Sequence, residues 1–203
     1  MTWQEFTALL GRATAMSFTP GPNTTLSTAL AANGGLRRAM PFVCAVPLGW
    51  SALLLVCAWG LGALVLAVPL LTWAVKAVGV AYLLWLSWKL SQARQLSEAS
   101  AAALMVGFWQ GVALQFVNIK AWMLALAIVS GWVAGRADTV QRLTIVVPTM
   151  LCFAFASNFL YATMGSLLRD WLRGPEGTGK RLRLFNRAMA LVLVVTAVWM
   201  AAL

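Results

Sequence analysis

The sequence of 203 residues contains no histidine and only five acidic residues, which leaves little material for acid–base or metal chemistry. The acids all lie in or beside the segments that connect apolar runs: Glu5, Glu98, Asp138, Asp170 and Glu176. A catalytic dyad or a metal cluster inside the apolar part of the chain would need side chains of these types. The composition therefore predicts a protein that is not an enzyme and has no cofactor and no metal.

Cysteine is scarce as well, with three residues in the chain: Cys44, Cys57 and Cys152. The number is odd, and the spacing is not that of a metal site. All three residues fall inside apolar runs, where a thiol behaves as a small apolar side chain. We expect neither disulfides nor a zinc site.

Apolar residues dominate what is present, at 62% of the chain, with 10% charged residues and a mean hydropathy of +0.83. These values are typical of an integral membrane protein. Runs long enough to span a bilayer occur at about 6–30, 39–66, 68–90, 104–133 and 143–168, with a shorter one at about 186–203. The pattern predicts an all-α membrane protein of six transmembrane helices. Five spans are the alternative, because the last run is short.

The net charge of +10 comes mainly from basic residues in three of the predicted connections. These residues are Arg37, Arg38, Lys89, Arg94, Arg169, Arg173, Lys180, Arg181, Arg183 and Arg187. The positive-inside rule then places connections one, three and five in the cytoplasm and both termini outside. Short basic loops between membrane spans fit anionic lipid headgroups better than nucleic acid. We therefore expect the lipid bilayer, and no nucleic acid, as a partner.

A polar connection at 91–103 divides the predicted spans into two groups of three. No soluble domain interrupts the chain, so residues 1–203 are predicted to form a single transmembrane domain with half-repeats at about 1–91 and 104–203. An odd number of spans in each half forces the halves into opposite orientations, as in inverted-repeat transporters.

Small residues at close spacing predict tight helix packing at three pairs of positions: Gly107 with Gly111, Gly60 with Gly62, and Gly131 with Gly135.

The first apolar run is interrupted by the motif Phe18-Thr19-Pro20-Gly21-Pro22-Asn23. Its two prolines donate no backbone N–H, and their rings crowd the carbonyls of Met16 and Phe18. Irregular backbone at membrane depth persists only where protein buries it or where it lines a polar cavity. A simple proline kink is the alternative, but this motif exceeds what a kink requires. The motif predicts a broken helix with a binding site at the break.

Polar residues follow the break directly. Asn23 is a strong N-cap residue type and is expected to begin the second half-helix, followed by Thr24 and Thr25. A helix N-terminus attracts anions, whereas carbonyls freed by the prolines can accept from a cation. An α-amino acid carries a carboxylate and an ammonium at such a spacing. The residues therefore favour a zwitterionic ligand.

The fourth apolar run carries Gln115, Asn118 and Lys120 near the middle of the membrane. A lysine at the bilayer centre costs about 2.5–3.5 kcal/mol, so Lys120 is expected to face a polar cavity, with snorkelling as the alternative. On a regular helix Lys120 points roughly 200° away from Asn118. Both can line one cavity only if this helix is broken or distorted. In the fifth run, Asn158 is expected to form a hydrogen bond to a neighbouring helix.

Three segments carry a family resemblance. Thr19-Pro20-Gly21-Pro22-Asn23, the segment 78–89 (VGVAYLLWLSWK) and Asn118-Ile119-Lys120 resemble motifs of the LysE/RhtB family of bacterial amino-acid exporters, with Ile119 in place of the usual proline. The segments 85–89 and 114–120 are similar to the branch that exports cysteine and O-acetylserine. The resemblance implies a small, multi-pass efflux protein of the bacterial inner (plasma) membrane. It also implies coupling to the proton gradient, and it allows a homodimer.

Together these observations predict an exporter of small neutral amino acids or their derivatives, with alternating access around the broken first helix. The expected substrate-binding residues are Pro20, Gly21, Pro22, Asn23, Thr24, Gln115, Asn118, Lys120 and Asn158. Asn23 is expected near the substrate carboxylate, and Lys120 is expected to hold that carboxylate in the opposite access state or to balance a rim acid. The lack of acids within the spans disfavours lysine or arginine as a substrate. A non-transporting scaffold subunit, a passive channel, and an exporter of homoserine, threonine or leucine are the alternatives.

Overall fold

The computed structural model describes residues 1–93, 106–174 and 179–202, and within these ranges it contains helices and no strand. The helices are α1 (Trp3–Ser17), α2 (Pro22–Gly34), α3 (Leu36–Ala58), α4 (Leu61–Ala67), α5 (Pro69–Gln92), α7 (Phe108–Val117), α8 (Ile119–Trp132), α9 (Thr139–Arg173) and α10 (Lys180–Ala202). Most of the predicted 91–103 connection lies outside the described residues, as do the start of the second half at 104–105 and Arg94, Glu98 and Glu176.

Four of the described helices, α3, α5, α9 and α10, are long and apolar enough to cross a membrane, and the bent pair α7–α8 gives a fifth candidate span. The prediction of an all-α, multi-pass membrane protein is confirmed at this level. The predicted first span, 6–30, is divided into helices of 15 and 13 residues, neither of which is long enough by itself. Six spans in two inverted halves stay a prediction.

The last span is longer than its apolar run indicated. Helix α10 begins at Lys180 and contains 23 residues, so it starts before the expected boundary at about 186. Basic residues fill its first turns, where Arg181 lies over the ring of Trp171 at 4.9 Å from the centroid. These side chains lowered the apparent hydrophobicity of the segment without preventing a helix.

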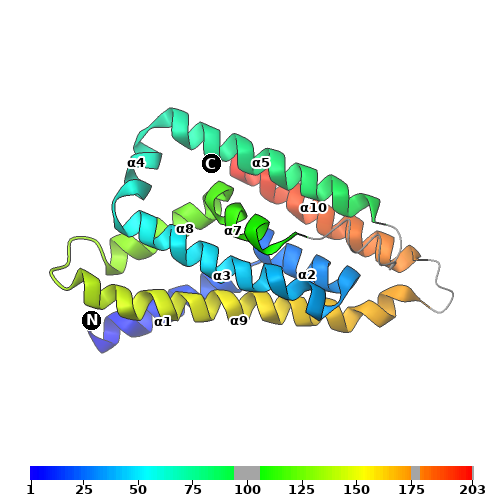
Figure 1. Ribbon diagram of the computed structural model, residues 1–203, viewed down its shortest axis with the longest axis horizontal. Helices are drawn as coiled ribbons and strands as arrows, with labels where there is room; N and C mark the ends of the chain where they lie inside the picture. Colours follow the sequence, from blue (N-terminus) through cyan, green and yellow to red (C-terminus); the bar gives the residue numbers. More distant parts are fainter. Residues whose placement is uncertain (94–105, 175–178, 203) are drawn as a thin grey trace.

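Figure 1 shows the described parts of the three basic connections at one end of the molecule: the α2–α3 turn, the end of α5, and the end of α9 with the start of α10. The N-terminus, the α8–α9 loop and the end of α10 lie toward the opposite end. This arrangement is the one that the positive-inside orientation requires. The orientation itself stays a prediction.

Helix α2 lies at the centre of the bundle and packs against α9, α3 and α10. Ten of its thirteen residues are buried. Its polar side chains are hydrogen-bonded to its neighbours: Ser27 Oγ donates to Asn158 Oδ1 of α9 at 2.9 Å. Asn33 and Asn186 of α10 exchange two amide hydrogen bonds of 2.8 and 3.0 Å. Buried polar groups that are satisfied in this way fix a helix in one position.

Close helix packing depends partly on the predicted small residues. Gly111 contacts α3, because a β-carbon there would come within 2.8 Å of the Ala45 side chain, and Gly62 packs against Cys57 and Leu126. The prediction is wrong for Gly60, Gly107, Gly131 and Gly135, where an added β-carbon would meet no other helix of the described part of the chain. The closest approaches occur at two other glycines. A β-carbon at Gly165 would overlap the Thr28 carbonyl of α2, and one at Gly79 would overlap the Val117 carbonyl.

The three cysteines lie within α3 and α9, inside the apolar runs as predicted, and each is a free thiol. Cys57 is buried, Cys44 is half-buried and Cys152 is exposed on the surface of the bundle.

Candidate functional site

The first half of the chain is broken where the proline motif predicts. Helix α1 ends at Ser17, and α2 begins at Pro22 with Gly21 as its N-cap residue. Proline suits the first helical position because its missing N–H would have no partner there. The Thr24 hydroxyl accepts a 3.0 Å hydrogen bond from the Gly21 N–H. The prediction that Asn23 caps α2 is therefore wrong, because Asn23 already lies inside the helix.

Asn23 instead connects the two halves of the chain. Its Nδ2 donates to Gln115 Oε1 of α7 at 2.8 Å, and Gln115 Nε2 donates back to Asn23 Oδ1 at 3.2 Å. Gln115 is fully buried and also donates to the Gly111 carbonyl at 3.0 Å. Two amides that exchange hydrogen bonds satisfy most of each other's polar capacity. The pair thus joins the beginning of α2 to α7.

Carbonyls freed at this break receive side-chain donors from other helices. Tyr161 of α9 donates its hydroxyl to the Phe18 carbonyl at 3.0 Å. Lys120 Nζ contacts the Pro20 carbonyl at 3.4 Å. Pro20 has no N–H to donate to the Met16 carbonyl, so the C-terminal end of α1 presents partial negative charge at the break.

The second half is also broken, without any proline. Helix α7 ends at Val117, Asn118 adopts an extended backbone (φ −92°, ψ 98°), and α8 continues at an angle of 70°. Asn118 Oδ1 caps α8 by accepting from the Lys120 N–H at 3.2 Å. The indole of Trp122 donates to the freed Phe116 carbonyl at 2.8 Å. The bend resolves the geometric conflict in the sequence, because Asn118 and Lys120 now line one cavity.

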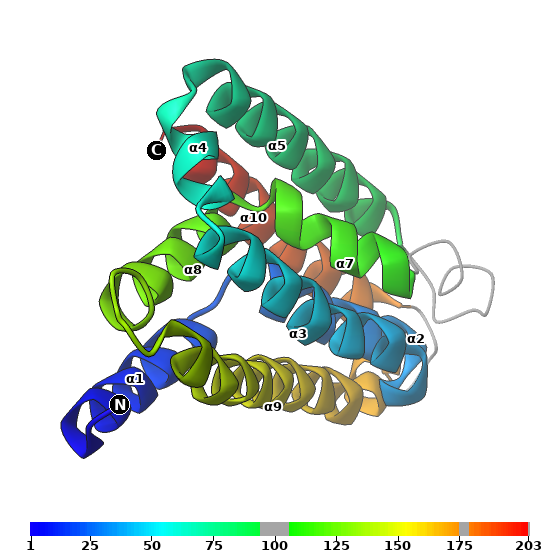
Figure 2. The same cartoon turned by 60° about the vertical axis from the view of Figure 1, so that its left-hand side comes forward.

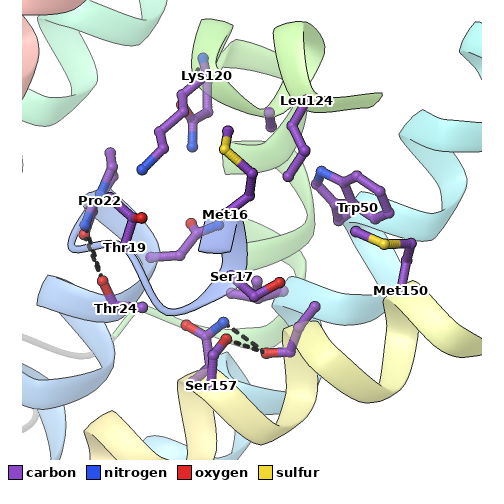
Figure 3. A pocket seen from close by; sticks show the side chains of 17 residues that line it. Met16, Ser17, Thr19, Pro22, Thr24, Trp50, Lys120, Leu124, Met150 and Ser157 are labelled. Atoms are coloured by element: carbon purple, nitrogen blue, oxygen red, sulfur yellow. Dashed lines mark hydrogen bonds between the residues drawn. The ribbon is translucent and has the colours of Figure 1, made fainter. Parts of the chain in front are cut away.

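This cavity lies between the two breaks, and Figure 3 shows its walls. It has a volume of about 70 Å³. At roughly 10–15 Å³ per water molecule, it has room for about five to seven water-sized groups, which is the size of a small amino acid. The lining residues are Met16, Ser17, Thr19, Gly21, Pro22, Asn23, Thr24, Val46, Trp50, Asn118, Lys120, Ala121, Leu124, Met150, Ala154, Ser157 and Asn158.

Seven of the nine predicted site residues line this cavity: Gly21, Pro22, Asn23, Thr24, Asn118, Lys120 and Asn158. Pro20 and Gln115 do not line it, but each contacts a residue that does. Asn158 uses its Oδ1 to accept from Ser27 and its Nδ2 to donate to the Ala154 carbonyl, so the predicted interhelical bond is present.

Sequence reasoning missed the apolar wall of the cavity, formed by Val46, Trp50, Leu124 and Met150, together with Met16. These residues come from α1, α3, α8 and α9. Aromatic and aliphatic residues are common throughout every span, and no local signal separates these positions from lipid-facing ones. Lys76 and Arg12, two further basic residues within the apolar runs, do not line the cavity.

The electrostatics of the cavity suit a zwitterion. The N-termini of α2 and α8 both open onto it, and each carries partial positive charge. Lys120 adds a full positive charge, and no acidic side chain in the described part of the chain contacts it. A carboxylate fits between these groups, and an ammonium fits beside the carbonyl end of α1. The described residues contain no group of three or more His, Cys, Asp or Glu side chains that could hold a metal ion.

A second charged cluster holds the N-terminal end of α1, which Figure 2 shows at the edge of the bundle beside α8 and α9. The Arg142 guanidinium contacts Asp138 at 2.7 Å and Glu5 at 3.2 Å, and Arg136 contacts Glu5 at 3.5 Å. The N-terminal ammonium of Met1 lies 3.7 Å from Asp138. We call these five residues the α1 latch.

The carboxyl groups of the α1 latch have shifted pKa values. A backbone hydrogen bond from Thr2, followed by the bond from Arg142, lowers the pKa of Glu5. The hydrogen bond from Arg142 lowers the pKa of Asp138. Both carboxylates are therefore charged at neutral pH.

Comparisons with known proteins identify the family of the chain. The family described as LysE type translocator matches residues 14–202. The chain is 30% identical over 182 residues to a protein of Salmonella choleraesuis named "Cysteine/O-acetylserine efflux protein", with 90% of each chain covered. It is 31% identical over 186 residues, again with 90% of each chain covered, to a protein of Escherichia coli of the same name. No solved structure matches the chain. The chain therefore belongs to the LysE type translocator family, and it is a transporter of the multi-pass membrane class.

Proposed function

We propose that this protein exports small neutral amino acids or their derivatives, of the cysteine or O-acetylserine class, across the bacterial inner membrane. One observation carries the proposal. The N-termini of α2 and α8 and the side chain of Lys120, which contacts no acidic side chain in the described part of the chain, all line a cavity with room for a small amino acid. Such a site binds the carboxylate that all α-amino acids share. The names of the relatives support the substrate class. Coupling to the proton gradient and a homodimeric assembly are further predictions from the family resemblance.

Access is proposed to alternate around the two breaks. The helix N-termini and Lys120 form one group that can remain with the substrate, while α1 moves relative to α2 at the non-helical segment 18–21. Helix α2 is held by hydrogen bonds to α7, α9 and α10, whereas α1 contacts mainly α8 and α9. The element most free to move is thus the one that supplies the carbonyls for the ammonium.

The proposed role of Lys120 can be tested by its substitution. Lys120→Gln removes the charge that pairs with the substrate carboxylate, and a charge-assisted hydrogen bond contributes about 1.5–3 kcal/mol. We expect KM for O-acetylserine in proteoliposomes to rise about tenfold to a hundredfold, with partial recovery in Lys120→Arg. The matched control is Lys76→Gln, since Lys76 lies over the Trp73 ring and outside the cavity. A wild-type KM in Lys120→Gln would remove Lys120 from the site.

A non-transporting scaffold is the alternative from another class. A scaffold would tolerate both Lys120→Gln and Asn23→Ala without loss of function, because its role would depend on the outer faces of its helices.

A passive channel is a further alternative, which would conduct substrate without exchange. Countertransport in proteoliposomes separates it from a carrier, because only a carrier accelerates efflux when substrate is present on the opposite side.

A further inference from the structure

Trp50 of α3 is one of the residues that line the cavity, and its buried indole N–H has no hydrogen-bond partner. Its side chain is 5% exposed. Its Nε1 is one of three buried side-chain polar atoms without a hydrogen bond in the described part of the chain. Other indoles of the bundle do find acceptors: Trp122 Nε1 donates to the Phe116 carbonyl and Trp132 Nε1 to the Glu5 carbonyl, both at 2.8 Å. Buried donors are normally paired, so an unpaired one at a cavity wall indicates a ligand.

The surroundings of Trp50 show which part of a ligand it would meet. Figure 3 places Trp50 next to Leu124 and Met150, with Lys120 on the opposite side of the cavity. The cavity thus has a charged end at the helix N-termini and an apolar end with a single buried, unpaired donor. A small amino acid held by its carboxylate at the charged end would direct its side chain toward the indole.

We propose that Trp50 Nε1 donates a hydrogen bond to an acceptor on the substrate side chain and thereby selects side chains that carry a carbonyl. The inference rests on the proposed function and extends it to specificity. An ester or amide carbonyl is a strong acceptor and a thiol sulfur is a weak one. A hydrocarbon side chain offers no acceptor and leaves the donor unpaired in an apolar wall. Sites that hydrogen-bond their substrate discriminate strongly against analogues that lack the bonding group.

Two substrates that differ at one group test this proposal. O-acetylserine carries an ester carbonyl, and O-ethylserine replaces that carbonyl with a methylene while keeping the ether oxygen and the length. We expect kcat/KM in proteoliposomes of the wild-type protein to be about tenfold higher for O-acetylserine than for O-ethylserine, because one hydrogen bond contributes about that factor. Trp50→Phe keeps the ring and removes the N–H. It should bring the ratio close to one by lowering the value for O-acetylserine.

The control is Trp109→Phe, because Trp109 is 78% exposed on α7 and does not line the cavity. Its substrate ratio should equal that of the wild type. A wild-type ratio near one, or an unchanged ratio in an active Trp50→Phe protein, would overturn the role of Trp50 and leave the proposed function standing. If the wild type transports neither compound nor cysteine, the proposed function fails first and the inference falls with it. The wild-type ratio is decisive even if Trp50→Phe does not fold.

Discussion

At the scale of single residues, the amide pair Asn23–Gln115 shows how a polar side chain in a membrane protein serves structure and site together. Both residues were predicted to bind substrate, yet the structure pairs them with each other across the two halves. The pair fixes the first turn of α2, whose N-terminus faces the cavity. Its loss should therefore affect stability directly and transport indirectly.

A double-mutant cycle with Asn23→Ala and Gln115→Ala measures this coupling. Interhelical hydrogen bonds in membranes contribute about 0.6 kcal/mol on average and up to about 1.7 kcal/mol. We expect a coupling energy in that range from unfolding in detergent. Asn23→Ala combined with Asn186→Ala is the control. Asn23 lies in the first turn of α2 and Asn186 contacts Asn33 near its end, so their effects should add. Strict additivity of the Asn23 and Gln115 variants would contradict the pairing.

Most polar residues of the site could be predicted from the sequence, because polar side chains are rare within the apolar runs and are costly in hydrocarbon. Asn118 and Lys120 could be recognised by their cost in hydrocarbon. Trp50 could not, since tryptophans recur throughout the chain and their usual role is interfacial. Only the packing of α3 against α8 and α9 shows that this indole is buried beside a cavity.

At the scale of helices, the second break shows that an extended residue and a side-chain cap suffice to divide a span. Asn118 has the backbone conformation that a residue before proline prefers, and Ile119 occupies the first position of α8. The position is thus already suited to proline. Sequence reasoning identified the requirement for a break but no residue that would impose it.

This geometry predicts that Ile119→Pro is tolerated by the backbone. Ile119 is 2% exposed, so loss of its side chain also lowers stability, and Ile119→Ala is the matched reference. We expect the two variants to unfold within about 1 kcal/mol of each other. Ala125→Pro, inside α8, should lower stability by about 3 kcal/mol or more relative to wild type. Equal damage from the two proline variants would show that α7 and α8 form a continuous helix.

The sequence predicted where helices form better than it predicted the residues at which they begin and end. The run 39–66 reads as one apolar segment, yet Gly60 adopts a positive φ of 88° and separates α3 from α4. Hydropathy cannot detect such a turn, because both sides of it are apolar. In α10 the reverse holds: charged residues lowered the hydropathy of its first turns, where Arg181 lies over the Trp171 ring.

At the scale of the whole molecule, the contacts between helices can be compared with those that the inverted repeat predicted from the sequence would require. If α1–α2, α3 and α5 correspond to α7–α8, α9 and α10, then α2 should pack on α9 as α8 packs on α3. Both contacts are present, as are α3 with α7, α1 with α9, and α5 with α10. Figure 1 also shows the pairs α1–α2 and α7–α8 running in opposite directions between the ends of the molecule. Both halves therefore begin with a broken helix at the same cavity.

In this arrangement α1 is the helix held by charge, and its position should depend on pH. The carboxyl groups of Glu5 and Asp138 have lowered pKa values in the folded protein, with Arg136, Arg142 and the N-terminal ammonium facing them. Their contribution is complete above the ordinary carboxyl range of about 4 and is lost as pH falls through the lowered values. Acidification below about pH 4 should therefore release α1 before the bundle opens.

Spin labels at Thr7→Cys and Val140→Cys, in a chain whose native cysteines are replaced, report the distance between α1 and α9. We expect a narrow distance distribution at pH 7 that broadens below about pH 4. Glu5→Gln combined with Asp138→Asn should be broad at both pH values, because its latch has no carboxylate to protonate. Labels at Trp88→Cys and Leu184→Cys on the packed pair α5–α10 should not change. A narrow α1–α9 distribution in the Glu5→Gln and Asp138→Asn double variant at pH 7 would show that apolar packing, rather than the α1 latch, holds α1 in place. The site would then have to open through another helix.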